Sequence, residues 1–203
     1  MKLLKLFIKS MPAGVLVSIA ATIYLCVENS VVGAILFSFG LFTVSITQST
    51  LFTGIAGYFP QRKWWELVVS FCGNFTGCML YGAGYSLSGA HDKIYDRVYQ
   101  LCDMKFSSGW GVAYIMAIFC GILMFLGVDT FKKHRDVVGV TVGMLCISGF
   151  IISGFENSMA NMAYLALSHY ELTLEVILKL IVMGLGNFTG AILTRLVMQF
   201  NEK

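Results

Sequence analysis

Long apolar blocks almost free of charge restrict this chain's fold more than any other feature. The charges gather in short clusters, at the N-terminus, at Arg62 and Lys63, over residues 91–105 and over residues 129–136. Charged residues make up 12% of the chain, whereas a soluble domain carries about 25%. The mean hydropathy of +0.77 and the small net charge of +3 argue against a soluble enzyme, a disordered chain and a nucleic-acid-binding domain. We therefore predict an integral membrane protein with no nucleic-acid partner.

Six membrane crossings fit between the charge clusters, because a helix needs about 20 apolar residues to cross the bilayer core. They lie at about residues 11–27, 29–61, 65–87, 106–128, 137–168 and 172–199. The second and fifth stretches are too long for one straight helix and too short for two full spans. The polar residues 91–105 are expected to form a loop. The prediction is an all-α polytopic membrane protein with six transmembrane helices, two of them broken, in one domain over residues 1–203.

The basic residues orient these crossings. On one side lie Lys2, Lys5, Lys9, Arg62, Lys63, Lys132, Lys133, Arg135, Arg195 and Lys203. The other side holds Lys93, Arg97 and Lys105, offset by Asp92, Asp96 and Asp103. Cytoplasmic loops carry the excess of lysine and arginine. We expect a multi-pass protein of the cell (inner) membrane with both termini in the cytoplasm.

A five-residue motif occurs twice, letter for letter. Gly73–Gly77 reads GNFTG, and so does Gly186–Gly190. With three crossings in each half, the second half enters the membrane in the opposite orientation. This predicts an inverted 3+3 repeat, with repeat one at about residues 11–88 and repeat two at about 106–200. Locally, the paired glycines also fit close helix packing, and we expect Asn74 and Asn187 to bond backbone groups freed by broken helices.

The helix breaks are the strongest functional signal that the residues give. They are expected near residues 50–54 in the first half and 153–158 in the second, where residues 160–162 read Ala-Asn-Met. Irregular backbone at membrane depth survives only where it is buried in protein or lines a cavity. Glu156 lies in the second break, where a carboxylate costs about 2.5–3.5 kcal/mol unless it is satisfied. It either caps a half-helix, faces a partner or contacts substrate, and each role places it beside a pathway.

These residues together resemble the formate/nitrite transporter family. Family members carry a Leu-Phe-Thr motif at the first break, matched by residues 51–53, and Gly-Asn-x-x-Gly in spans three and six. At the second break they carry Phe-Glu-His-Ser-x-Ala-Asn-Met, where residues 155–162 here read FENSMANM. The resemblance implies an aquaporin-like protomer with its own pore, assembled as a pentamer.

The resemblance also implies roles for single residues. Leu41, Leu51 and Phe52 match the cytoplasmic-side constriction, and Phe150 matches the periplasmic-side constriction. Thr53 matches the threonine of the first break, and Lys105 matches a lysine that helps to set the electrostatics of the pore. Asn161 belongs to the second-break motif and, with Asn74 and Asn187, is assigned a structural role.

Two departures from the family pattern change the middle of the expected pore. The central histidine is Asn157 here, and the asparagine of span four is Gly121. Asparagine offers hydrogen bonds but does not titrate, and Gly121 is expected to enlarge the pore. The three histidines, His91, His134 and His169, are expected to be solvated loop residues that cannot replace the missing imidazole.

Two substrate classes remain open. The first is the family's own, a small monovalent anion such as formate, nitrite or hydrosulfide, with Lys105, Thr53 and half-helix N–H groups supplying positive potential. The second is ammonium or ammonia, if Asn157 presents its carbonyl oxygen, Glu156 its charge, and the phenylalanines their faces. The expected partners are the small ion, membrane lipid and further copies of the chain.

Other classes fit the sequence less well. A hydrolase would need Ser158 activated by a base, and Lys179 is a candidate only if the helices bring it close. A scaffold without transport would not explain two breaks in corresponding positions. No cysteine–histidine cluster has metal-ligand spacing, so neither an enzyme nor a metal or cofactor is expected.

Overall fold

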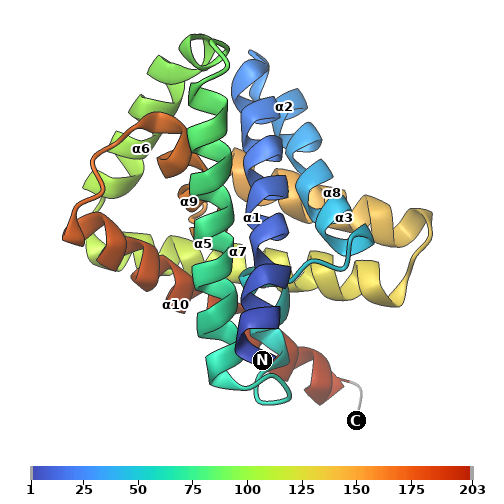
Figure 1. The fold of residues 1–203 in the computed structure, drawn as a ribbon. Coiled ribbons are helices and arrows are strands. Elements are labelled where there is room, and N and C mark those ends of the chain that lie inside the picture. The colour runs from blue at the N-terminus through green and yellow to red at the C-terminus, as the bar shows by residue number, and fades with distance from the viewer. Residues whose placement is uncertain (1, 202–203) are drawn as a thin grey trace.

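A computed structural model gives the fold and describes residues 2–201. This part of the chain contains helices, joined by short connections, and no strand (Figure 1). The elements are α1 (Lys2–Cys26), α2 (Ser30–Phe37), α3 (Phe39–Ile46), α4 (Phe52–Ile55), η1 (Ala56–Tyr58), α5 (Trp64–Ser86), η2 (His91–Lys93), α6 (Tyr95–Ser107), α7 (Trp110–Lys133), α8 (Val137–Ile152), α9 (Ser158–Ser168) and α10 (Leu174–Asn201).

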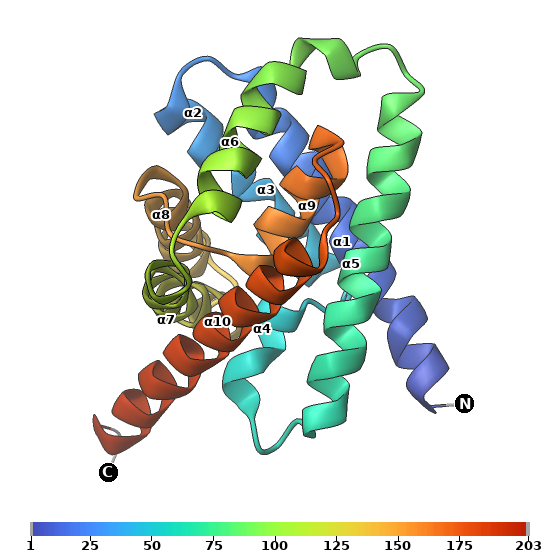
Figure 2. The same ribbon diagram turned by 90° about the vertical axis from the view of Figure 1, so that its left-hand side faces the viewer.

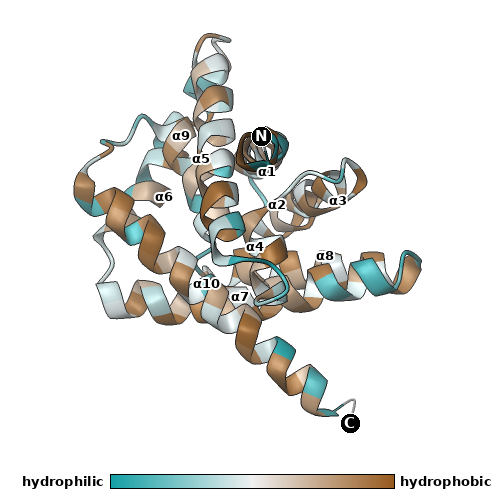
Figure 3. Cartoon of the chain, turned by 60° about the horizontal axis from the view of Figure 1, so that its bottom comes forward, coloured by the Kyte–Doolittle hydropathy of each residue, from teal (hydrophilic) through white to brown (hydrophobic). Residues whose placement is uncertain are grey.

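Within this part of the chain, four helices, α1, α5, α7 and α10, are long and apolar enough to cross a membrane. The residues of α2 and α3 and those of α8 form shorter apolar stretches. Large apolar side chains such as Ile115 on α7 and Leu185 on α10 are more than half exposed, and Figure 3 shows hydrophobic residues along the outer helices. The prediction of an all-helical chain with several apolar helices is confirmed.

Two pairs of long helices pack backbone to backbone through glycine. On α5, a Cβ added at Gly77 would lie 2.0 Å from the Met11 carbonyl oxygen of α1. On α10, a Cβ at Gly190 would lie 2.1 Å from the Ile118 carbonyl oxygen of α7. Because a side chain cannot fit at these distances, glycine is what lets each pair approach. The last glycine of both GNFTG copies therefore has the packing role considered from the sequence.

Both overlong stretches are interrupted. The first is non-helical over residues 47–51 and the second over residues 153–157. The residues before the restarted helices have nearly the same extended backbone, with φ −102° and ψ 128° at Leu51 and φ −100° and ψ 113° at Asn157. The breaks fall within a few residues of the expected positions.

The polar segment between the halves is a helix rather than the loop that we expected. Ile94, Val98 and Cys102 follow one another at helical spacing and are fully buried, while Asp96 is exposed and Arg97 is half-buried. This apolar stripe packs α6 against α9 (Figure 2). The prediction was wrong because it weighed the charges of the segment and not the period of its apolar residues.

Helix α1 begins and α10 ends toward the same, lower side of the molecule in Figures 1 and 2. Helix α9 and the short α4 contact helices of both long pairs, whereas α8 packs on α7 and α2. The last residues of both breaks, Thr50, Leu51, Glu156 and Asn157, are buried. The residues expected at the pore are therefore held inside the protein.

Candidate pore site

A buried ion pair stands at the second break. The Lys105 Nζ of α6 donates to the Glu156 Oε2 at 2.9 Å, and the two residues are 8% and 6% exposed. The carboxylate thus faces a partner, one of the roles left open for it. Because each charge compensates the other, neither acts as an isolated ion in the membrane interior.

Asn161 extends this pair into a polar cluster. Its Nδ2 donates to Glu156 Oε2 at 2.6 Å and to the Met183 sulfur at 3.0 Å. Its Oδ1 is buried and has no partner within residues 2–201. Lys105, Glu156 and Asn161 line a cavity of about 110 Å³ together with Phe150 and Tyr164.

The Asn157 side chain caps helix α9. Its Oδ1 accepts hydrogen bonds from the Met159 N–H at 2.9 Å and the Ala160 N–H at 3.2 Å. Because backbone N–H groups can only donate, the oxygen end of this amide is fixed and the Nδ2 end remains as a donor.

Asn74 and Asn187 make equivalent bonds in the two halves. Asn74 Oδ1 accepts from the Phe52 N–H at 2.8 Å, and its Nδ2 donates to the Thr50 carbonyl at 2.9 Å. Asn187 Oδ1 accepts from the Ser158 N–H at 2.9 Å, and its Nδ2 donates to the Glu156 carbonyl at 2.8 Å. Each asparagine therefore satisfies backbone groups on both sides of a helix break.

Each asparagine also reaches the long helix beside it. Asn74 Nδ2 donates to the Ser10 carbonyl of α1 at 2.8 Å, and Asn187 Nδ2 donates to the Ala117 carbonyl of α7 at 2.9 Å. The GNFTG motif thus combines close helix packing with support of a break.

Gly121 faces the backbone of α10 and not open space, whereas we expected this glycine to enlarge the pore. A Cβ at this position would lie 2.2 Å from the Asn187 carbonyl oxygen. Gly14 stands in the same relation to the other half, with its Cβ position 2.1 Å from the Asn74 carbonyl oxygen. Glycine is needed at both sites because the backbone of a neighbouring helix occupies the side-chain space.

The expected constriction residues are buried but do not share one cavity. Phe150 lines the small cavity and packs edge-on against Phe37, with ring centroids 6.2 Å apart. Phe52 packs edge-on against Phe71 at 5.2 Å and borders a different cavity, described below. Neither cavity is lined by Leu41, Leu51, Thr53 or Asn157. Thr53 is 3% exposed, and its hydroxyl has no partner in the described chain.

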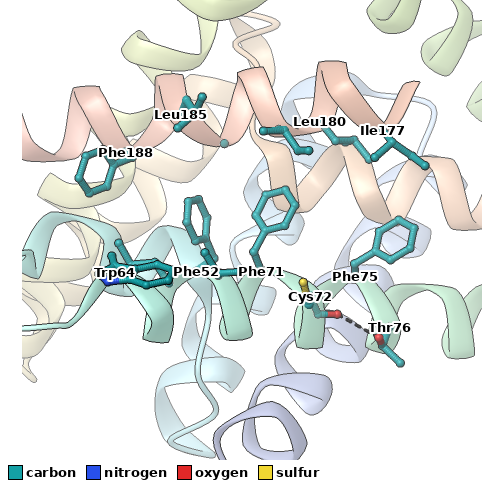
Figure 4. Close-up of a pocket in the computed structure, with 14 residues that line it drawn as sticks. Phe52, Trp64, Phe71, Cys72, Phe75, Thr76, Ile177, Leu180, Leu185 and Phe188 are labelled. Carbon is teal, nitrogen blue, oxygen red and sulfur yellow. Dashed lines mark hydrogen bonds between the residues drawn. The ribbon is translucent and has the colours of Figure 1, made fainter. Parts of the chain in front are cut away.

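The larger cavity is an apolar groove of about 610 Å³ between α5 and α10 (Figure 4). Phe52, Phe71 and Phe75 line it from one side, and Leu180 and Phe188 from the other. The hydroxyl of Thr76 in its wall donates to the Cys72 carbonyl at 2.9 Å. The groove therefore offers an apolar surface rather than a polar path.

One of the three histidines, His91, differs from expectation. His91 is 8% exposed, and its Nε2 donates to the Leu167 carbonyl at 2.7 Å. Its ring lies 4.6 Å from the His169 ring, centroid to centroid. His91 is therefore a packed residue and not a solvated one, because η2 turns it onto the end of α9. His134 and His169 are exposed.

The residues considered for hydrolysis have other partners. The Ser158 hydroxyl donates to Asn187 Oδ1 at 2.8 Å. Lys179 Nζ donates to the carbonyls of Phe106 and, at 2.8 Å, of Ser108. Both side chains serve the fold at these positions.

Tyr164 lines the small cavity and was not singled out from the sequence. It is 3% exposed and lies three residues after Asn161 on α9. Helical spacing from the second-break motif places it on the same face as Asn161, and this was the signal that could have identified it.

Comparison with known proteins gives matches within one family of membrane transport proteins. The family model described as formate/nitrite transporter matches residues 1–200. Formate channel FocA of Escherichia coli, from strain K12 and from O157:H7, is 27% identical over 183 residues, covering 78% of this chain and 64% of the relative. The match thus spans less than two thirds of the length of these relatives.

Two solved structures share the fold. A pentameric formate channel with formate bound superposes with a TM-score of 0.81 at 21% identity, covering 100% of this chain and 98% of that one. An FNT family ion channel gives a TM-score of 0.82 at 21% identity, covering 99% of this chain and 89% of that one.

Proposed function

Because this chain belongs to the formate/nitrite transporter family, we propose that it is a membrane channel or transporter for a small monovalent anion of the formate, nitrite or hydrosulfide class. The observation that carries this proposal is the orientation of the Asn157 amide. Its oxygen is taken up by two backbone N–H groups of α9, so the end left for a ligand is a hydrogen-bond donor.

Hydrogen-bond donors at this depth suit an anion. A small anion that enters a low-dielectric pore loses hydration worth many kcal/mol unless the protein offers donors in return. The Asn157 amide and the unpartnered Thr53 hydroxyl are two such donors at equivalent breaks. Lys105 is neutralised by Glu156, so the anion is stabilised by hydrogen bonds more than by net positive charge.

The ammonium alternative is weakened at two of the groups on which it depended. The Asn157 oxygen already accepts two hydrogen bonds. Glu156 Oε2 is bound by Lys105 and Asn161. A cation would have to displace these partners to gain Asn157 Oδ1 or Glu156 Oε2.

The architecture that goes with this function is also a proposal. Six crossings in an inverted 3+3 repeat would make an aquaporin-like pore in each protomer of a pentamer, with both termini in the cytoplasm. The equivalent bonds of Asn74 and Asn187 and the equivalent packing of Gly14 and Gly121 support the repeat. The related pentameric formate channel with formate bound supports the pentamer and a formate-class anion.

Flux in proteoliposomes tests the proposal. Formate, nitrite and hydrosulfide are compared with ammonium and methylammonium under matched gradients, with empty liposomes as the control. We expect anion uptake well above the control and cation uptake at the level of the control. Selective uptake of ammonium, or no flux of any of these ions by folded protein, would overturn the proposal.

A further inference from the structure

Helices α4 and α9, which restart after the two breaks, differ in how much stabilisation they receive from their own length and caps. Helix α9 has 11 residues and its N-cap residue Asn157 accepts two hydrogen bonds. Helix α4 has only four residues, and its N-cap residue Leu51 provides no side-chain cap. Short helices are marginal without tertiary support. Since α4 carries Phe52 and Thr53, the first half of the expected pore depends on support from outside.

Helix α7 supplies part of this support. The Asp129 Oδ1 accepts a hydrogen bond from the Tyr58 hydroxyl at 2.9 Å, and Asp129 is 7% exposed. The Lys132 Nζ donates to the Gly54 carbonyl at 3.3 Å and lies 4.2 Å from the centre of the Tyr58 ring. The side chain of Tyr58 is thus held from two sides by one turn of α7.

Helix α10 holds the other end of the segment through one guanidinium group. Arg195 Nη1 lies 3.0 Å from the Gly57 carbonyl, 2.8 Å from the Phe59 carbonyl and 2.5 Å from Gln61 Oε1. These carbonyls follow the last turn of α4 and η1, where helix carbonyls lack partners within the helix. A cation at this end also suits the helix dipole.

We propose that Arg195 and Asp129 are positioning residues that hold residues 51–59 in place and thereby set the width of the anion path at Phe52 and Thr53. The group formed by Tyr58, Asp129, Lys132 and Arg195 is called the clamp below. Its effect on transport rests on the proposed function. Its effect on the segment does not, because the contacts act on the backbone directly.

The clamp connects the two halves of the chain. Tyr58 and the carbonyls belong to the first half, and Asp129, Lys132 and Arg195 belong to the second. A movement of α7 relative to α10 would therefore change the position of α4. Asn74, which bonds the Phe52 N–H, fixes only the start of the helix.

Hydrogen exchange and anion selectivity together test the clamp in liposome-embedded protein. The variants are Arg195→Gln and Asp129→Ala, with Arg135→Gln as the matched control, because Arg135 is an exposed basic residue in the α7–α8 connection. Loss of the clamp should speed amide exchange in residues 51–59 by about tenfold. It should also raise the flux of a larger carboxylate such as lactate relative to formate. Arg195→Lys should restore part of both effects, because it keeps the charge and loses the fork.

The two readouts separate the possible failures. Exchange and selectivity equal to those of Arg135→Gln would overturn the clamp. Faster exchange with unchanged selectivity would overturn its role in setting the path. If the wild-type protein passes no anion, the proposed function fails, while exchange still decides whether the clamp holds the segment. If Arg195→Gln does not fold, Asp129→Ala gives the same decision.

Discussion

Lys105 and Glu156 show how a single pair can neutralise charge inside a membrane protein. Removing one partner of a buried pair leaves the other charge uncompensated and costs about 3–5 kcal/mol. We predict that Glu156→Gln lowers the free energy of unfolding by about this amount, measured by denaturation in detergent. Asp92→Asn, at an exposed carboxylate, is the matched control and should change it little.

The double variant Lys105→Met with Glu156→Gln should be more stable than Glu156→Gln alone, because no isolated charge remains. Additive losses from the two single changes would contradict the pairing. The family resemblance and the second break indicated the two residues separately, but not their contact. Lys105 and Glu156 are 51 positions apart in the sequence. Their contact depends on α6 being a helix, and the charges of this segment led us to predict a loop.

Asn157 determines whether the central position responds to pH. Histidine has an unperturbed pKa of about 6.5 and titrates near neutral pH, whereas asparagine does not. We predict that wild-type anion flux is nearly independent of pH between about 6 and 8. In Asn157→His the flux should rise as pH falls, because the imidazolium attracts the anion or gives it a proton. A flat profile from folded, active Asn157→His protein would remove this residue from the anion path.

At the scale of helices, glycine decides how closely the long pairs pack. Gly121→Ala would place a methyl group 2.2 Å from the Asn187 carbonyl oxygen, so α7 and α10 must separate. We predict a loss of about 1–3 kcal/mol in unfolding free energy. Gly111→Ala on the same helix is the control, because its Cβ would meet nothing within 4 Å and should stabilise by about 0.4–1 kcal/mol. Equal effects of the two changes would contradict this packing.

The elements themselves could be predicted to differing degrees. Both breaks were found because polar and small residues interrupt apolar stretches near Thr50 and Glu156. Gly121 was misplaced because a glycine gives no sign of which neighbour it approaches. The clamp was missed because Asp129 and Arg195 were counted only as loop and end charges. The partners of Arg195 are mainly backbone carbonyls, which leave no trace in a sequence.

For the whole molecule, the distribution of basic residues and the helix order should agree on one topology. Helix α1 begins and α10 ends on the same side (Figures 1 and 2), as an even number of crossings requires. From the basic residues we predict that this side, together with Arg135, lies in the cytoplasm. The connection that contains Ser88 should then face the opposite side of the membrane.

Cysteine labelling of intact cells tests this topology. The six native cysteines, all free within the described residues, are first replaced, and a single cysteine is returned as Ser88→Cys or Arg135→Cys. Both positions are exposed, so access depends on the side of the membrane. We predict that an impermeant maleimide labels Ser88→Cys in intact cells and labels Arg135→Cys only after the membrane is opened. The reverse labelling pattern would mean that the molecule has the opposite orientation in the membrane. Labelling of both in intact cells would rule out an odd number of crossings between these positions, and with it the division into two halves of opposite orientation.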